Sequence, residues 1–164
     1  MDNFQISLMT LEDLDHISSN LSLEFDSFWN YNTIKSEIEN PDSIVLVAKE
    51  NNQIVAFAGI WKAIDVMHLM DIVVAKSHRR KNIASLLMKE IINITLKNNI
   101  NELTLEVSET NLPAINLYTK FGFKNLGIRK NYYGVNNNAI IMTLYIDKLH
   151  KTDEHCLPLH IDKN

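Results

Sequence analysis

Three consecutive basic residues stand directly before the most strongly periodic apolar segment of the chain. Residues 79–84 read Arg-Arg-Lys-Asn-Ile-Ala, and a helix is expected to begin within them. A helix start offers backbone N–H groups without intrahelical partners together with the positive end of the helix dipole, so it can hold a pyrophosphate. The small Ala84 would let such a ligand come close. From this hexapeptide alone, a solvated helix cap is an equally good interpretation.

Two titratable side chains follow in segments that could carry proton transfer. Apolar and polar residues alternate from Leu103 to Ser108, which predicts a strand with Glu106 on its polar face. Tyr118 stands in a predicted helix beside Leu117 and Phe121. Periodicity alone favours plainer roles for both, a polar residue on the wet side of a strand and an aromatic residue that packs in the core.

The elements that must position these residues follow from apolar spacing and turn residues. Strands are expected at residues 6–8, 44–48, 54–58, 66–74, 103–107, 124–130 and 139–146, and helices at 11–20, 31–39, 80–97 and 113–121. Residues 21–30 are expected to form a loop and residues 50–53 a hairpin turn, because Asn tolerates positive φ. This order predicts an α/β (α+β) fold with one curved, mixed, mostly antiparallel sheet flanked by helices.

The composition of the chain limits the classes of protein to which it can belong. The chain has 164 residues, of which 46% are hydrophobic and 22% charged, as expected for one globular domain, here 1–148, followed by a flexible tail at 149–164. The net charge of −4 argues against direct nucleic-acid binding. Neither a signal peptide nor a membrane span is recognisable, and the lone Cys156 suits a reducing compartment. We expect a cytoplasmic protein that is a monomer or weak dimer.

The histidines near the end of the sequence do not predict a metal site. His150, His155 and His160 lie near Cys156, but their spacing matches no zinc pattern. No metal is expected.

The motifs together resemble the GNAT superfamily of N-acetyltransferases. Residues 79–84 are similar to its acetyl-CoA signature, Q/R-x-x-G-x-G/A, with Asn82 in place of the usual Gly; Asn is among the non-Gly residues most able to adopt a left-handed conformation. Residues 105–123 are similar to its E-V…N-x-x-A-x-x-L-Y…G-F segment. Residues 129–133 and 139–142 resemble the R-x-N-Y-Y and A-x-x-M elements of the RimI subgroup, the ribosomal-protein alanine N-acetyltransferases. Residues 28–30 resemble its F-x-W-S/T substrate loop.

This resemblance implies acetyl transfer from acetyl-CoA to the N-terminal α-amine of a protein, most specifically a small-subunit ribosomal protein that begins with alanine. Glu106 would be the general base, acting directly or through a water, and Tyr118 the general acid. The residues implied to bind acetyl-CoA are Ile72, Val73 and Val74 through their backbone amides, Arg79, Arg80, Lys81, Asn82, Ile83, Ala84 and Ser85 at the helix start, and Asn111, which could equally cap the next helix.

Substrate contacts are implied for three aromatic residues, Trp29, Tyr132 and Tyr133. Glu24 and Asp26 would attract a basic N-terminal segment. A surface tyrosine pair and an ordinary acidic loop are the simpler interpretations.

Two other functions remain open. The same fold could acetylate a small amine such as a polyamine or an amino acid. It could also be a non-catalytic acyl-CoA sensor, although the presence of both Glu106 and Tyr118 argues against that reading.

Overall fold

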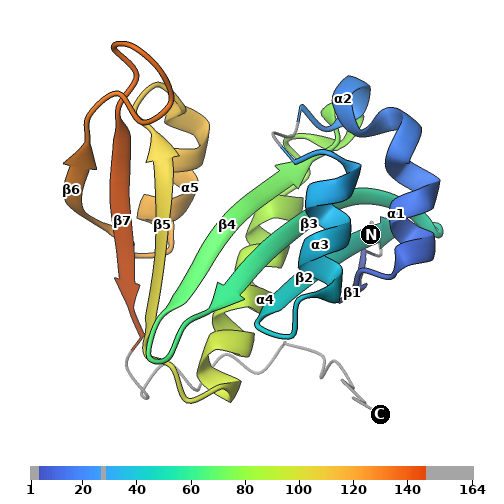
Figure 1. The fold of residues 1–164 in the computed structure, drawn as a ribbon, viewed down its shortest axis with the longest axis horizontal. Helices are drawn as coiled ribbons and strands as arrows, with labels where there is room; N and C mark the ends of the chain where they lie inside the picture. The colour runs from blue at the N-terminus through green and yellow to red at the C-terminus, as the bar shows by residue number, and fades with distance from the viewer. Residues whose placement is uncertain (1–3, 27–28, 147–164) are drawn as a thin grey trace.

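Seven strands form one sheet in the order β1-β2-β3-β4-β5-β7-β6 (Figure 1). The structure, a computed structural model, describes residues 4–26 and 29–146. The strands are β1 (Gln5–Leu8), β2 (Ser43–Glu50), β3 (Gln53–Lys62), β4 (Met67–Val74), β5 (Glu102–Ser108), β6 (Lys124–Arg129) and β7 (Ala139–Tyr145). Neighbouring strands are antiparallel except for β4 and β5, which run parallel. The predicted mixed, mostly antiparallel sheet is confirmed.

Helices cover both faces of this sheet (Figure 1). They are α1 (Leu11–Ile17), α2 (Leu21–Glu24), α3 (Tyr31–Glu39), α4 (Ile83–Lys97) and α5 (Leu112–Lys120), with 3₁₀ turns η1 (Ser18–Asn20) and η2 (Lys76–His78). On β2, Val45 and Val47 pack with the α1 and α3 side chains, whereas Leu46 and Ala48 pack in the cluster that contains α4. The central strands are therefore buried on both faces and read as continuous apolar runs.

Local sequence explains the element boundaries. Thr10 and Asp13 form a reciprocal capping box at the start of α1. Asn51 and Asn52 adopt φ of 50° and 65° in the β2–β3 turn, which confirms the predicted Asn-based hairpin. Gly122 has φ of 90° just after α5, where an L-residue with a side chain would be strained.

Several boundaries differ from the sequence prediction, including three that involve helices. The helix expected from residue 80 begins at Ile83, because Arg80 and Asn82 both have left-handed backbone conformations, with φ of 68° and 61°. The helix expected at 11–20 ends at Ile17 and continues as η1, and part of the expected loop at 21–30 forms α2. Propensity did not separate a helix from a 3₁₀ turn at these short segments.

Residues 147–164, and with them the predicted tail and its histidines, lie outside the described part of the chain. Within residues 4–26 and 29–146, no helix has the length and apolar character needed to cross a bilayer. Over the same ranges, no three His, Cys, Asp or Glu side chains are grouped as a metal site would require.

Glu90 is a buried carboxylate on α4, and one of its oxygens, Oε1, has no hydrogen-bond partner within the described residues. Burial raises the pKa of Glu90, while Asn93 and then Lys97 oppose that rise. Because the pKa of Glu90 is higher in the folded than in the unfolded protein, its contribution to the free energy of unfolding is fully present below the unfolded-state pKa, about 4.3. That contribution is lost as pH rises through the folded-state pKa. Ionised Glu90 therefore destabilises the fold at neutral pH.

We predict that Glu90→Gln raises the free energy of unfolding at pH 7 relative to the original chain, by about 1 kcal/mol, the usual cost of a poorly paired buried polar group. The difference should shrink toward pH 4, where the original carboxyl is protonated. Urea denaturation at several pH values measures it. An effect of equal size at pH 4 and pH 7 would show that packing, not ionisation, is responsible.

Candidate active site

The strands β4 and β5 separate after a short parallel ladder, and a cavity opens where they part. Their register pairs only residues 67–69 with residues 103–105; beyond that point β4 continues along β3, while β5 continues along β7. The cavity has a volume of about 940 Å³ and is lined from both strands as well as from α5 and the β6–β7 connection. It brings together seven of the predicted site residues: Trp29, Ile72, Glu106, Asn111, Tyr118, Tyr132 and Tyr133.

Glu106 lies on β5 just past the point of separation. Leu105 and Val107 are buried on the opposite face of the strand, in the α4 cluster, so Glu106 faces the cavity as its alternation predicted. Its Oε1 accepts a hydrogen bond from Nη1 of Arg129 at 2.6 Å, and its side chain is 28% exposed. A half-buried carboxylate in this position can accept a proton from a ligand in the cavity.

Tyr118 reaches the cavity from α5. The residue is 6% exposed, and its ring lies 5.6 Å from that of Phe123. Burial raises the pKa of Tyr118 well above the usual value for tyrosine, and the charge of Asp71 and the nearby Tyr133 add to the rise. The phenol therefore keeps its proton at neutral pH and can act as a hydrogen-bond donor or acid. The packing role and the cavity role both apply to this residue.

The free edge of β4 offers backbone groups to the cavity. The register with β3 shifts between Gly59 and Ile60, which pair with Asp71 and Leu69, so Met70 is an extra residue on β4; bulges of this kind often lie beside active sites. Ala75 donates its N–H to Val55 of β3. Because N–H groups alternate along a strand, the amides of Ile72 and Val74 are expected to point away from β3, toward the cavity.

Val73 differs from its two neighbours on β4. By the same alternation its amide is expected to point toward β3, so it does not join the cofactor-binding edge implied by the resemblance. Its side chain is buried in the α1/α3 cluster. Ile72 and Val74 pack partly against the α4 cluster, so all three side chains serve the core, as predicted.

The segment before α4 has the geometry expected of a phosphate-binding loop. Asn82 adopts the left-handed conformation that its Gly-like position predicted, and its side chain does not cap the helix. The Asn82 side chain therefore does not compete for the first amides of α4, at Ile83, Ala84 and Ser85. These residues fit a pyrophosphate, which binds to such amides and to the positive helix end.

Three cationic side chains around this loop, Lys76, Arg79 and Lys81, lie close to acidic partners. Arg79 donates from Nη2 to Asp26 at 3.0 Å and from Nε to the carbonyl of Val74 at 3.3 Å. Lys76 pairs with the same Asp26 at 2.8 Å, and Lys81 lies 3.8 Å from Glu50. Asp26 was predicted to attract a basic peptide, but its carboxylate already pairs with Lys76 and Arg79, so a peptide would have to compete with these two cations.

Glu24, the other acidic residue assigned to peptide attraction, lies near the same loop. Its Oε2 accepts a hydrogen bond from Ser77 at 3.4 Å. Lys76 also donates to the carbonyl of Leu23 at 2.8 Å, so two polar contacts join α2 to η2.

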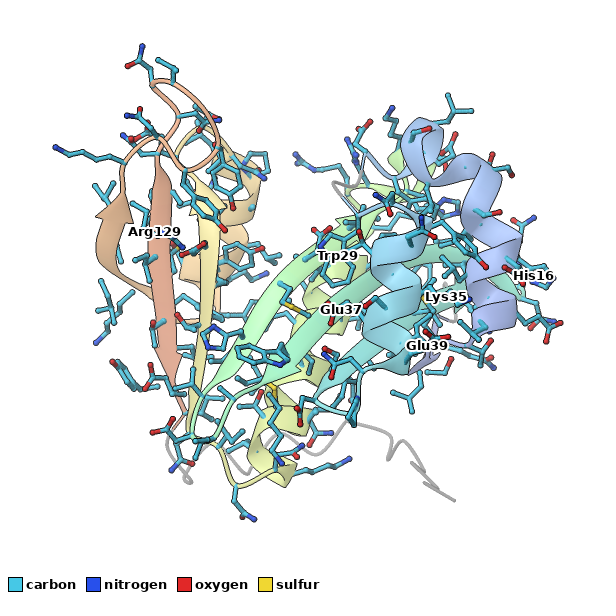
Figure 2. The ribbon with its side chains drawn as sticks, in the orientation of Figure 1. His16, Trp29, Lys35, Glu37, Glu39 and Arg129 are labelled. Carbon is cyan, nitrogen blue, oxygen red and sulfur yellow. The ribbon has the colours of Figure 1, made fainter. Side chains whose placement is uncertain are left out.

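Trp29 covers Gly59 of β3, on the side of the cavity opposite Arg129 (Figure 2). A Cβ built on Gly59 would lie 2.2 Å from Cη2 of the Trp29 indole, so only glycine leaves room for the ring there. Asn30, which replaces a hydroxyl residue of the resembled motif, caps α3 by accepting from the N–H of Thr33 at 3.0 Å. Asn111 likewise caps α5 through Ala114 at 3.2 Å, which confirms its capping role.

The β6–β7 connection is fastened to β5 at several points. The hydroxyl of Tyr133 donates to the backbone carbonyl of Glu106 at 3.1 Å, and its ring meets Tyr132 edge to face at a centroid distance of 5.0 Å. Asn138 donates to the carboxylate of Glu109 from both its backbone and its side chain, each at 3.1 Å. The two tyrosines therefore border the cavity as a fixed wall.

Sequence reasoning missed several cavity residues. They are Trp61, His68, Asp71, Thr104 and Arg129. The rings of Trp61 and His68 lie 5.4 Å apart because the two residues pair directly across the β3–β4 hairpin, whereas the sequence prediction ended the first of these strands at residue 58. Arg129 belongs to a recognised motif, but its contact with Glu106 spans 23 residues and depends on the order of β5, β7 and β6.

The fold and the cavity define an acyltransferase architecture, and family comparison agrees. Residues 7–123 match the model of the acetyltransferase (GNAT) family. The chain belongs to this family, and acetyl-CoA is its co-substrate.

Individual relatives show which enzymes of this family the chain is similar to. A Bacillus subtilis protein, provisionally named a ribosomal protein bS18-alanine N-acetyltransferase, is 32% identical over 142 residues, which span 85% of this chain and 94% of that protein. The ribosomal protein bS18-alanine N-acetyltransferase of Haemophilus influenzae is 33% identical over 122 residues, 72% of this chain and 82% of its own length. The crystal structure of the ribosomal-protein-S18-alanine N-acetyltransferase from Escherichia coli superposes with a TM-score of 0.77 at 27% identity, covering 94% of this chain and 99% of that one.

We predict that Gly59→Ala displaces Trp29, because the new methyl group would overlap the indole ring. The KM for the amine acceptor should rise while the KM for acetyl-CoA stays close to its original value, at a cost of about 1–3 kcal/mol in stability. In a Trp61→Phe background, the fluorescence of Trp29 reports the displacement. Gly127→Ala is the matched control, since its Cβ would lie 3.7 Å from Ile141, and an equal effect there would contradict the steric explanation.

Proposed function

We propose that this enzyme transfers acetyl from acetyl-CoA to the N-terminal α-amine of a protein, a small-subunit ribosomal protein that begins with alanine. The observation that carries the proposal is that Glu106 and Tyr118 line one cavity where β4 and β5 separate. The names of the Haemophilus influenzae and Escherichia coli relatives support this choice of acceptor. We place the reaction in the cytoplasm, where ribosomal proteins are made.

The two side chains would divide the proton transfers between them. Acetyl-CoA supplies an acyl carbon activated by a thiol leaving group. An α-amine has a pKa of about 7.7–8.0 and is largely protonated at neutral pH, so Glu106 accepts its proton, directly or through a water, and frees the nitrogen lone pair. As the new C–N bond forms and the C–S bond breaks, the nitrogen releases its surplus proton to solvent. The hydroxyl of Tyr118 donates a hydrogen bond or proton to the departing sulfur, and a donated proton is replaced from solvent.

The remaining predicted residues would bind and orient the two substrates. The amides of Ile72 and Val74 would bond the pantetheine arm and polarise the acetyl carbonyl. The first-turn amides of α4, with Arg80 and Lys81 beside them, would hold the pyrophosphate. Trp29, Tyr132 and Tyr133 would contact the first residues of the acceptor.

The acceptor assay tests the proposal. The purified chain is mixed with acetyl-CoA and synthetic peptides that differ only in their first residue, and release of free coenzyme A is measured together with the mass of the peptide. We expect acetylation of the α-amine of peptides that begin with alanine. An N-terminally blocked peptide with an internal lysine and a polyamine are the controls, and acetylation of only these would assign the chain to small-amine or lysine chemistry.

We predict that Glu106→Gln and Tyr118→Phe each lower kcat by roughly 10²–10⁴-fold, the usual contribution of a general base or acid. Both replacements keep size and shape, so the fold should persist, which thermal denaturation checks. Glu102→Gln, on the same strand as Glu106, and Tyr145→Phe are the matched controls. Both are expected to retain activity, and Tyr145 is 58% exposed. If Glu106→Gln and Tyr118→Phe both left kcat unchanged, neither residue would act as the general base or acid.

A further inference from the structure

The guanidinium of Arg129 contacts the predicted base and an aromatic ring at the same time. Nη1 donates to Oε1 of Glu106 at 2.6 Å, and Cζ lies 4.2 Å from the centroid of the Tyr132 ring, a cation–π arrangement. The hydrogen bond and the charge of Glu106 raise the pKa of Arg129, so the arginine stays charged and transfers no proton itself. Its position therefore bears on the geometry of Glu106.

The register of the sheet explains how Arg129 reaches across a strand. On β7, Ala139 pairs with Arg129 of β6 on one side and with Ser108 of β5 on the other. Residues that stand opposite one another share a face of the sheet, so Arg129 projects on the face of Ser108 and of Glu106, two residues before it. Because Ala139 carries only a methyl group, the long side chain can pass over β7.

This contact adds little to the stability of the fold. The Arg129 side chain is 53% exposed and that of Glu106 is 28% exposed, and ion pairs exposed to this degree contribute little to the free energy of unfolding. A free glutamate, however, can occupy several rotamers, and restricting it costs conformational entropy. A partner that itself lies over the Tyr132 ring restricts these rotamers before the substrate binds.

We propose that Arg129 is a positioning residue that holds the Glu106 carboxylate in the rotamer facing the amine. The inference rests on the proposed function, in which Glu106 is the base. Tyr132 contacts the guanidinium, and the hydroxyl of Tyr133 donates a hydrogen bond to the backbone carbonyl of Glu106. The two tyrosines that border the acceptor therefore also help to position the base.

A double-mutant cycle in the acetylation assay tests this role. We expect Arg129→Met to lower kcat by about 10- to 100-fold, the scale of a small misplacement of a catalytic group, with the KM for acetyl-CoA unchanged. Arg129→Lys should recover part of that loss, since lysine restores the charge but not the planar stack. In a Glu106→Gln background, Arg129→Met should cause no further loss, because the base that it positions is already absent. Lys130→Met is the matched control.

Three outcomes of the cycle would overturn the inference. Full additivity would mean that Arg129 acts independently of Glu106, for example by contacting the acceptor. If Arg129→Met retained the activity of the unmodified enzyme while Glu106→Gln was inactive, the positioning role would be refuted but the proposed function would remain supported. Original activity in Glu106→Gln would refute the base assignment, and with it the proposed chemistry.

A spectroscopic measurement keeps the test independent of turnover. In protein labelled with ¹³C at glutamate carboxyl carbons, the Glu106 resonance is identified by its absence in Glu106→Gln. We expect this resonance to move in Arg129→Met and to stay in place in Lys130→Met. A resonance that does not move in Arg129→Met would show that the arginine does not hold this carboxylate.

Discussion

The candidate site depends on one constraint, the short parallel ladder between β4 and β5. Only three residue pairs join these strands, after which each strand keeps its other neighbour and the two halves of the sheet diverge. A longer ladder would close the sheet and remove the cavity, while a shorter one would leave the two halves without a continuous core. Met67, Leu69, Leu103 and Leu105 hold the junction, since all four are buried in the cluster beneath α4.

From this junction, each half of the sheet supplies a different chemical function. The β4 half leads into the loop before α4, where left-handed Arg80 and Asn82 turn the chain so that the helix start is uncapped. The β5 half carries Glu106 and, through α5 and β6, Tyr118 and Arg129. Groups suited to binding anions and groups suited to proton transfer thus lie on different elements, one set on each half of the sheet.

Much of this arrangement could be predicted from the sequence, because the informative residues act locally. Alternation put Glu106 on the open face of β5, Asn-Asn gave the β2–β3 turn, and Pro113 with Asn111 marked the start of α5. The left-handed conformation at Asn82 followed from the identity of that residue.

Other parts could not be predicted, because they depend on contacts between distant segments. The pairing of Glu106 with Arg129 requires the strand order β5-β7-β6, and the fit of Trp29 over Gly59 requires the loop before α3 to lie against β3. The engagement of Asp26 by Lys76 and Arg79 also joins residues some 50 positions apart in the sequence. Neither spacing nor propensity carries information about such pairs.

The most direct measurement is a crystal structure with a conjugate in which coenzyme A is linked through an acetyl bridge to the α-nitrogen of an alanine-first peptide. We predict that the conjugate lies between β4 and β5, with its pyrophosphate at the amides of residues 83–85 and the alanine nitrogen within direct or water-mediated hydrogen-bond reach of Glu106. A conjugate bound outside this cavity, or one that places its nitrogen away from both Glu106 and Tyr118, would contradict it.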